Sequence, residues 1–579
     1  METVAPSQQR EAAPSTDHDS KTADDTWWRS GVIYQIYPRS FADGNGDGTG
    51  DLAGIRARLP YLKELGIDAI WYTPWYVSPL ADGGYDVADY RAIDPAFGTL
   101  AEAEVLITEA LELGIRTIID IVPNHVSAQH TWFQQALNAA PGSPERARFW
   151  FHKGLGPNGD EMPTHWPNNF GGEVWSRTTN PDGTPGEWYL HLFDSQQPDL
   201  NWSNPEIIDE HEQILKFWFD RGVAGIRIDS AALLVKDPAL PEIPENPGPG
   251  EHPNTDRDEL HEIYRGWRAV ADSYPGSRAL IGEIWLPDTE RFAAYLRPDE
   301  LHTAFNFDFM TRAWGATNLR ESIDMMLAAH EPVAAPATWV LSNHDVTRAV
   351  TRYGRSDSSF DFLKKRRGVP SDLELGTRRA RAAALLTAAL PGSLYIYQGD
   401  ELGLPEVEDL PLDQMHDPMF FRSNGTDPGR DGCRVPLPWR GDDPPFGFSL
   451  TDDHAPAWLT PPREWARYTA ARQDIDPDSM LTLYRRMLAI RRDEGSLGDG
   501  PMRWIDSERD VLAFRRGESF VNVSNLSEHP VTLPAGCVPL LSSMPLVEKP
   551  DGMTLPTDST VWLRLTDARQ HLTGEPRTA

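Results

Sequence analysis

The chain has 579 residues, of which 40% are hydrophobic and 24% charged. This is enough apolar sequence for a large core and enough length for several domains. Its formal net charge of −33 repels phosphate backbones and anionic membranes, which argues against nucleic-acid and lipid-surface functions. The charge suits a neutral substrate or reflects only solubility in salt, and composition leaves both interpretations open.

The cysteines and the apolar segments of the chain indicate its redox environment and its compartment. Two cysteines, Cys433 and Cys537, exclude a disulfide framework and leave one isolated bridge open. The first residues lack the apolar segment of a secretory signal, and no run of 18 apolar residues occurs. We therefore expect a cytoplasmic protein without a transmembrane helix. Residues 1–25 are polar and rich in Ser, Thr, Asp and Pro, which is typical of a disordered tail.

From residue 27 to about 480, short apolar runs alternate with amphipathic stretches, the order expected of β/α units with parallel strands. Most runs lack in/out alternation, as strands buried on both faces do. Eight units suggest a closed (β/α)8 barrel, although an open doubly wound sheet gives a similar pattern. The predicted strands are Val32–Tyr37, Ile67–Tyr72, Thr117–Val122, Val223–Ile228, Ala279–Ile284, Thr303–Phe307, Thr338–Leu341 and Leu394–Tyr397.

A Gly-rich loop with oxygen-bearing side chains at alternate positions follows the first strand, over residues 43–51. Hard oxygen ligands suit Ca²⁺ or Mg²⁺, but Gly54 at the twelfth position excludes an EF-hand. A helix is predicted over Leu52–Leu65, capped by Asp51 and ending before Gly66. A second helix is predicted over residues 101–113.

The units are unequal in length. About 70 residues, 126–196, separate the third strand from the next predicted helix, and loops of that length are functional or form a small domain. Further insertions lie at about 234–256 and 401–460. Beyond about 500, short strands indicate an antiparallel β-domain. We therefore divide the chain into a barrel (26–125 and 197–495), an inserted B domain (126–196) and a C-terminal β-domain (496–579).

Polar residues end four of the predicted strands, where TIM barrels carry their chemistry. The third strand leads to Asp120 and His125, the fourth to Arg227-Ile-Asp229, the fifth to Glu283, and the seventh to Ser342-Asn-His-Asp345. Any one Asp could be a helix cap, Arg227 and Asp229 a structural ion pair, and His125 a buried histidine. Such ends on four separate strands instead favour one shared site.

These strings resemble, in order, the four short signatures of the α-amylase superfamily, glycoside hydrolase family 13. Residues 31–38, 197–201 and 392–403 extend the resemblance, which covers the chain from Trp27. The resemblance implies Asp229 as nucleophile of a retaining mechanism and Glu283 as general acid/base. It also implies that Asp345 binds sugar hydroxyls and that Arg227 keeps Asp229 ionised.

Gln197-Pro-Asp-Leu-Asn201 resembles the form of that motif in oligo-1,6-glucosidases and α-glucosidases. By the same resemblance, Asp82 and Arg434 would pair to cap a terminal glucose, so that the pocket admits one sugar; a surface salt bridge is the alternative. The remaining substrate contacts implied are Tyr85, His125, His344, Phe170 and Phe193, of which either phenylalanine could be plain core.

Two further features bear on the family assignment. The loop after the first strand resembles the structural calcium loop of these α-glucosidases, with Asp43, Asn45, Asp47, the Thr49 carbonyl and Asp51 as implied ligands and Mg²⁺ as an alternative ion. Ser230, directly after Asp229, departs from the pattern because relatives more often have Val there. This departure leaves the preferred linkage open and could favour an acceptor other than water.

The leading expectation is an exo-acting α-glucosidase that releases glucose from small oligosaccharides or disaccharides. A glucosyl transferase or isomerase, such as a trehalose synthase or sucrose isomerase, would use the same residues. A non-catalytic subunit is the third alternative, and the complete set of Asp229, Glu283 and Asp345 argues against it. No motif decides between hydrolysis and transfer, and the oligomeric state is not determined.

Overall fold

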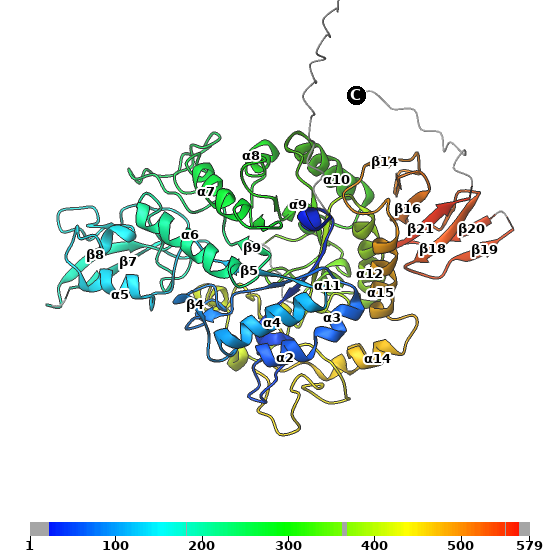
Figure 1. Ribbon diagram of the computed structural model, residues 1–579, viewed down its shortest axis with the longest axis horizontal. Helices are drawn as coiled ribbons and strands as arrows, with labels where there is room; N and C mark the ends of the chain where they lie inside the picture. Colours follow the sequence, from blue (N-terminus) through cyan, green and yellow to red (C-terminus); the bar gives the residue numbers. More distant parts are fainter. Residues whose placement is uncertain (1–22, 181, 362–367, 551, 567–579) are drawn as a thin grey trace, which may run out of the picture.

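The computed structural model describes residues 23–180, 182–361, 368–550 and 552–566. Eight parallel strands form one sheet in the order β11-β10-β9-β5-β2-β1-β13-β12 (Figure 1). Each strand neighbours its partners in chain order, without the reversal of a doubly wound sheet, so the (β/α)8 barrel is confirmed. The strands are β1 (Val32–Ile36), β2 (Ala69–Tyr72), β5 (Arg116–Ile121), β9 (Gly225–Ile228), β10 (Ala279–Gly282), β11 (Thr303–Ala304), β12 (Thr338–Val340) and β13 (Ser393–Tyr397).

The barrel is joined between β11 and β12 by side chains. Within the described residues, no backbone ladder pairs these two strands. The Thr338 hydroxyl instead donates to the Ala304 carbonyl (2.8 Å) and accepts from the Asn306 N–H (3.0 Å). A threonine hydroxyl therefore bridges backbone groups that a longer β11 would have paired directly.

Helices surround the barrel, with α12 and α15 between it and the C-terminal strands (Figure 1). Apolar faces of these helices pack on the strands, as in α4, where Ala103, Leu106, Ile107 and Ala110 are buried. The helices outside the B insertion are α1 (Pro38–Phe41), α2 (Leu52–Ala57), α3 (Leu59–Leu65), α4 (Leu100–Glu112), α6 (Pro205–Phe219), α7 (Leu260–Asp272), α8 (Thr289–Ala294), α9 (Phe307–Thr311), α10 (Ala316–His330), α11 (Ala349–Tyr353), α12 (Leu373–Ala389), α13 (Pro418–Arg422), α14 (Ala470–Asp474) and α15 (Met480–Asp493).

The predicted helix over residues 52–65 is two helices. Its start is confirmed, because the Asp51 carboxylate accepts the Gly54 N–H (2.6 Å), and its end is followed by Gly66 with φ +93°. The helix breaks at Arg58, because Pro60 in the first turn of α3 has no N–H to continue the preceding helix. The predicted sixth strand is likewise shorter, since Asn306 caps α9 by accepting the Phe309 N–H (2.9 Å).

The segment between β5 and α6 contains its own small sheet, in the order β6-β8-β7. The expectation that no helix occurs there is wrong, because His130 Nδ1 accepts the Trp132 N–H (3.2 Å) and starts α5. Buried Trp150, Trp166 and Trp175 form a separate apolar cluster. The elements are α5 (Thr131–Asn138), β6 (Phe151–His152), β7 (Trp175–Thr179) and β8 (Pro185–Leu190); the short β3 (Tyr76–Val77) and β4 (Asp89–Ile93) pair just before them in the chain.

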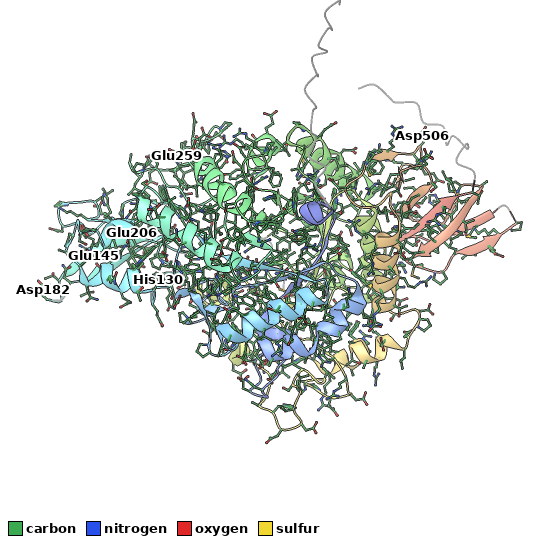
Figure 2. The ribbon with its side chains drawn as sticks, in the orientation of Figure 1. His130, Glu145, Asp182, Glu206, Glu259 and Asp506 are labelled. Atoms are coloured by element: carbon green, nitrogen blue, oxygen red, sulfur yellow. The ribbon has the colours of Figure 1, made fainter. Side chains whose placement is uncertain are left out.

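The C-terminal part is antiparallel, as expected. Its strands form two sheets, in the orders β14-β15-β16-β21-β18 and β17-β20-β19. In Figure 2, Glu145 and Asp182 lie at the far end of the B insertion, and Asp506 lies beside the C-terminal strands on the opposite side. The strands are β14 (Met502–Trp504), β15 (Val511–Arg516), β16 (Phe520–Asn525), β17 (Val531–Thr532), β18 (Cys537–Ser542), β19 (Val547–Lys549), β20 (Gly552–Leu555) and β21 (Ser559–Leu565).

The exact domain boundaries remain predictions from the sequence. Residues 23–25, assigned to the tail, belong to the 3-10 helix Ala23–Arg29, and the rest of that predicted tail lies outside the described residues. None of the helices in the described part of the chain combines the length and the apolar character needed to cross a membrane.

Candidate active site

Arg227 on β9 is the centre of a carboxylate cluster at the C-terminal ends of the strands. Its buried guanidinium contacts Asp229 Oδ1 (2.8 Å) and Glu283 Oε2 (2.8 Å), which come from neighbouring strands. It also contacts Asp120 Oδ1 (3.1 Å) from β5. The two carboxylates predicted to flank one sugar carbon therefore share one cation and lie on the same side of the barrel mouth.

Asp229 is strongly perturbed by this setting. Burial, followed by the neighbouring Glu283 carboxyl, raises the pKa of Asp229 well above its ordinary value, while Arg227 acts in the opposite direction. The expected effect of Arg227 thus has the right sign but is outweighed. Asp229 therefore holds a proton more readily than an isolated carboxyl would.

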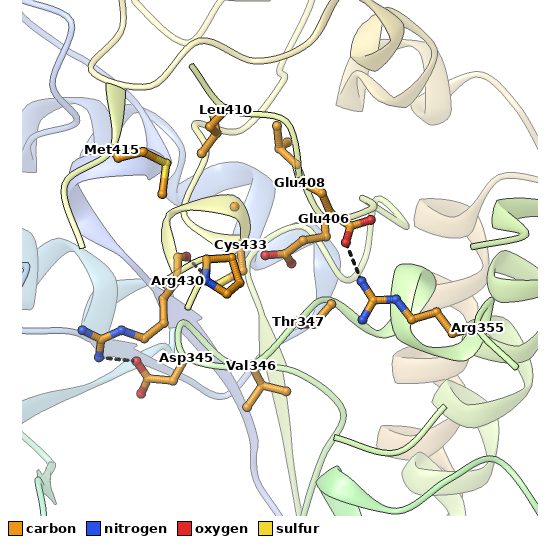
Figure 3. Close-up of a pocket in the computed structure, with 14 residues that line it drawn as sticks. Asp345, Val346, Thr347, Arg355, Glu406, Glu408, Leu410, Met415, Arg430 and Cys433 are labelled. Carbon is orange, nitrogen blue, oxygen red and sulfur yellow. Dashed lines mark hydrogen bonds and ion pairs between the residues drawn. The ribbon is translucent and has the colours of Figure 1, made fainter. Parts of the chain in front are cut away.

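Asp345 has the opposite character. Burial favours its neutral form, but the cationic groups around it hold the pKa of Asp345 below its ordinary value. Its Oδ1 accepts from Arg434 Nη2 (2.9 Å) and Arg430 Nη1 (3.1 Å), and the second of these contacts is drawn in Figure 3. Asp345 is therefore ionised at neutral pH.

A cavity of about 30 Å³ lies beside Asp345, among residues of the loops after β12 and β13 (Figure 3). Its walls include Val346, Glu406 and Cys433, and burial raises the pKa of Glu406 to about 7. This volume matches one water molecule and is too small for a sugar ring. The cavity thus belongs to the support of Asp345 and not to substrate binding.

The predicted pair of Asp82 with Arg434 is wrong. Asp82 Oδ1 instead contacts Arg430 Nη2 (2.6 Å), whereas Arg434 binds Asp345 and donates its Nε–H to the His344 carbonyl (2.9 Å). The two arginines flank one 3-10 turn, Asp431–Cys433, and both are buried at the site. Sequence spacing could not decide which one reaches Asp82, because both contacts are between distant segments.

Tyr85 and His344 lie face to face beside Arg227. Their ring centroids are 5.2 Å apart with an interplanar angle of 8°, and the Tyr85 hydroxyl donates to Asp120 Oδ2 (2.8 Å). Burial lowers the pKa of His344 and raises that of Asp120 to about 7, with Arg227 opposing the second shift. His344 is thus a neutral hydrogen-bonding group at neutral pH.

Phe170 and Phe193 of the B insertion lie together beside His125 and Arg430, and their role as an aromatic wall for a sugar stays a prediction. The Phe193 ring is 5.0 Å from His125 and 5.3 Å from Phe170, and the Arg430 guanidinium lies 5.1 Å from the Phe170 ring centroid. Burial lowers the pKa of His125 to about 4. Aromatic faces of this kind suit the apolar C–H patches of a sugar ring, while a neutral histidine can bind its hydroxyls.

Three residues of the cluster had no role in the sequence prediction: Asp120, Gln197 and Arg430. Asp120 lies opposite Arg227 in the register of the adjacent parallel strands β5 and β9. An alignment of the two predicted strands would have placed Asp120 beside Arg227. Gln197 Nε2 donates to Asp82 Oδ2 (3.0 Å) and lies 3.1 Å from His125 Nε2. Gln197 lies within a segment that carries the resemblance, Arg430 lies four residues before Arg434, and only the fold brings Gln197 and Arg430 together.

Glu283 is held from three sides. Its Oε2 accepts the Ser230 N–H (2.9 Å) in addition to Arg227, and its Oε1 accepts the Trp285 Nε1–H (3.0 Å). Trp285 stacks on Phe307 with centroids 3.6 Å apart. The half-exposed Trp285 thus orients the one Glu283 oxygen that Arg227 and Ser230 leave available.

The Gly-rich loop after β1 holds its carboxylates by backbone hydrogen bonds. Asp43 accepts the N–H groups of Gly46 (2.6 Å) and Gly48 (3.0 Å), and Asp51 accepts that of Gly44 (3.1 Å). Asn45, Asp47 and Thr49 complete the ring by local bonds. Over the described ranges, no three His, Cys, Asp or Glu side chains are grouped to hold a metal. The donor types suit a hard cation, and calcium stays a prediction.

A protein-family model, alpha amylase catalytic domain, matches residues 35–500 of this chain. An enzyme of Rhizobium meliloti (strain 1021) named "Probable alpha-glucosidase" is 35% identical over 538 residues, which cover 88% of this chain and 91% of that protein. An oligo-1,6-glucosidase of Heyndrickxia coagulans is 32% identical over 549 residues, covering 87% and 93%.

Solved structures similar to this chain include an alpha-glucosyl transfer enzyme and a trehalulose synthase. A crystal structure described as an alpha-glucosyl transfer enzyme superposes with a TM-score of 0.79 at 33% identity, covering 93% of this chain and 99% of that one. The trehalulose synthase of Pseudomonas mesoacidophila MX-45 superposes with a TM-score of 0.80 at 31% identity, with the same coverage.

Proposed function

This chain belongs to the alpha-amylase family, and we propose that it is a retaining, exo-acting α-glucosidase that releases terminal glucose from short α-linked oligosaccharides. The observation that carries the proposal is the shared contact of Arg227 with Asp229 and Glu283, at 2.8 Å each. One guanidinium holds the two carboxylates beside each other, which favours the double-displacement route, in which the two acids lie closer together than in single displacement.

In the first step, Asp229 attacks the anomeric carbon and Glu283 gives its proton to the departing glycosidic oxygen. The Glu283 oxygen that serves is Oε1, because Oε2 already accepts from Arg227 and Ser230. Asp345, kept ionised by Arg430 and Arg434, binds ring hydroxyls and stabilises the positive charge that develops on the sugar. A covalent glucosyl ester on Asp229 results.

In the second step, water attacks the same carbon and gives its proton to Glu283, while the ester bond to Asp229 breaks. The stereochemistry at the anomeric carbon is inverted twice and therefore retained. Tyr85 and His344 form one side of the sugar site and Phe170 and Phe193 another, so the ring is held while the leaving group changes.

Exo action is supported by two ion pairs that join the loops around Asp345. The Asp82–Arg430 pair and the Arg422–Asp194 contact (3.2 Å) join the loop after β13 to both the loop after β2 and the B insertion. A pocket closed in this way admits only the non-reducing end of a chain. Short substrates therefore fit, and internal bonds of a long glucan do not.

A substrate panel with maltose, isomaltose, sucrose, trehalose and soluble starch tests the activity, with the anomer of released glucose followed by NMR. We expect α-glucose as the first product from a disaccharide and little reducing power from starch. Initial release of β-glucose would exclude retention, and shortening of starch from within would exclude exo action.

A second candidate is glucosyl transfer or isomerisation, favoured by the structural similarity to trehalulose synthase. Both activities pass through the same covalent intermediate, and the acceptor decides between them. Incubation with sucrose separates the two, because hydrolysis yields glucose and fructose in equal amounts, whereas isomerisation yields a new disaccharide and little free sugar.

A further inference from the structure

Ser230, like Arg227, contacts both acids of the proposed mechanism. Its backbone N–H donates to Glu283 Oε2 (2.9 Å), and its hydroxyl donates to Asp229 Oδ2 (3.0 Å). The Asp229 Oδ1 atom accepts from Arg227 (2.8 Å). Each oxygen of the nucleophile therefore has its own donor, one cationic and one neutral.

Ser230 reaches both acids through an uncommon backbone conformation. Its φ is +47°, in the left-handed region that L-residues other than Gly rarely adopt. The turn is held by the Asp229 N–H on the Ile121 carbonyl (2.9 Å) and the Ala231 N–H on the Glu283 carbonyl (3.0 Å). Strain of this kind persists where the surrounding structure imposes it, and it clusters at functional sites.

We propose that the Ser230 hydroxyl is a positioning group that speeds the release of the glucosyl unit from Asp229. The inference rests on the proposed retaining function. A hydroxyl hydrogen-bonds a carboxylate anion more strongly than it bonds an ester, because the anion carries the greater negative charge. The bond therefore strengthens as Asp229 leaves the sugar and weakens as Asp229 attacks it.

The release step balances without a further reactant. The water oxygen forms a bond to the anomeric carbon, the bond from that carbon to the Asp229 oxygen breaks, and its electron pair returns to the carboxylate. The water proton passes to Glu283. Ser230 keeps its own proton throughout and donates a hydrogen bond that becomes shorter and stronger as charge returns to Oδ2.

The test is the separation of the two steps in Ser230→Ala, with p-nitrophenyl α-glucoside as substrate. An activated leaving group makes formation of the intermediate fast, so kcat reports its release and kcat/KM its formation. We expect kcat to fall about tenfold, within the range for a hydrogen bond to a charged group, while kcat/KM stays equal or rises. The glucosyl-enzyme should accumulate in acid-quenched samples measured by mass spectrometry.

Ser230→Thr and Ser230→Val form a matched pair, because they have the same branched shape and the same strain at positive φ but differ by one hydroxyl. The Ser230→Thr variant should keep a release rate closer to that of the parent than the Ser230→Val variant does, and Ser230→Val should accumulate the intermediate. Equal falls in kcat and kcat/KM without accumulation, or equal behaviour of Thr and Val, would overturn the proposal. Absence of any glucosyl adduct on Asp229 in every variant would instead reject the retaining function itself.

Discussion

At Asp229 the demands of chemistry and of folding conflict. The carboxyl is buried beside Glu283 and Asp120, and Arg227 provides a compensating charge. A carboxyl whose pKa is raised on folding binds its proton more tightly in the folded than in the unfolded state. Its contribution to stability is therefore present at low pH and is lost as pH rises through the folded pKa.

This sign predicts the behaviour of Asp229→Asn. The variant should lose several orders of magnitude in kcat, because the attacking carboxylate is gone, yet its thermal stability at pH 8 should equal or exceed that of the parent. The difference in melting temperature should shrink as pH is lowered. Thermal melts from pH 4 to 9 with kcat measured in parallel check this, and a variant less stable than the parent only at high pH contradicts the assigned shift.

Trp285 offers a second prediction at the residue scale. Trp285→Phe keeps the stack on Phe307 but removes the N–H that orients Glu283 Oε1. We expect about a tenfold loss of kcat/KM on maltose, whose leaving group needs a proton, and little loss on p-nitrophenyl α-glucoside, whose leaving group does not. Equal losses on both substrates would show that Trp285 acts only through packing.

At the scale of elements, the turn Asp431–Cys433 matters because it carries an arginine on each flank. Arg430 reaches Asp82, Asp345 and Asp417, so it ties the loop after β13 to the loops after β2 and β12. Arg434 reaches Asp345 alone among these carboxylates. The first arginine therefore joins elements, and the second supports one carboxylate.

Arg430→Ala should accordingly raise KM for maltose about tenfold or more and allow slow cleavage of soluble starch, because the pocket end opens and Asp82 loses its partner. Arg434→Ala is the matched comparison, with an expected fall in kcat and no change in the starch-to-maltose activity ratio. Chromatography of starch digests together with maltose kinetics measures both. An unchanged ratio in Arg430→Ala would reject its role in exo action.

The loop after β1 carries the calcium prediction. Since α2 begins at Asp51, an ion bound to this loop should stabilise the helix start without contacting the barrel mouth. Addition of EDTA should lower the melting temperature, Ca²⁺ should restore it, and kcat at 25 °C should not change. Exposed Asp47 provides the control, because Asp47→Ala should abolish the response to Ca²⁺. A melting temperature indifferent to both reagents excludes the metal.

At the scale of the whole molecule, the C-terminal sheet supports the barrel from outside. Trp562 on β21 is fully buried, and its Nε1–H donates to the Leu385 carbonyl of α12 (3.0 Å). Helix α12 thus lies between the barrel and the C-terminal sheet (Figure 1). The C-terminal domain therefore packs on the barrel and has no direct contact with the carboxylate cluster among the bonds described.

Trp562→Ala should lower the free energy of unfolding by about 3–5 kcal/mol, the usual cost of removing a buried tryptophan, and leave kcat unchanged at 25 °C. Chemical denaturation with activity measured before unfolding checks both. Trp504→Ala on the half-exposed β14 serves as the control and should cost less. A large fall in kcat for Trp562→Ala at a temperature where it is folded would mean that the sheet shapes the site.

Local patterns in the sequence sufficed for the barrel and for the candidate carboxylates. Asp229, Glu283 and Asp345 follow buried strands, and parallel strands bring their carboxyl ends to one edge whatever the loops between them do. The cap of α2 at Asp51 and the glycine that follows α3 were likewise readable, because both depend on neighbours within a few residues.

Contacts between distant segments were decided only by the tertiary structure. Arg430 contacts Asp82 in place of the predicted Arg434, and Gln197 donates a hydrogen bond to Asp82. Both contacts join loops that are more than 100 residues apart in the chain. The contacts of Ser230 with two carboxylates required its positive φ, which no residue type specifies. Hydrophobic periodicity acts along the chain and therefore determines the elements, whereas the pairing and the pKa of buried charges depend on which side chains the finished fold places beside them.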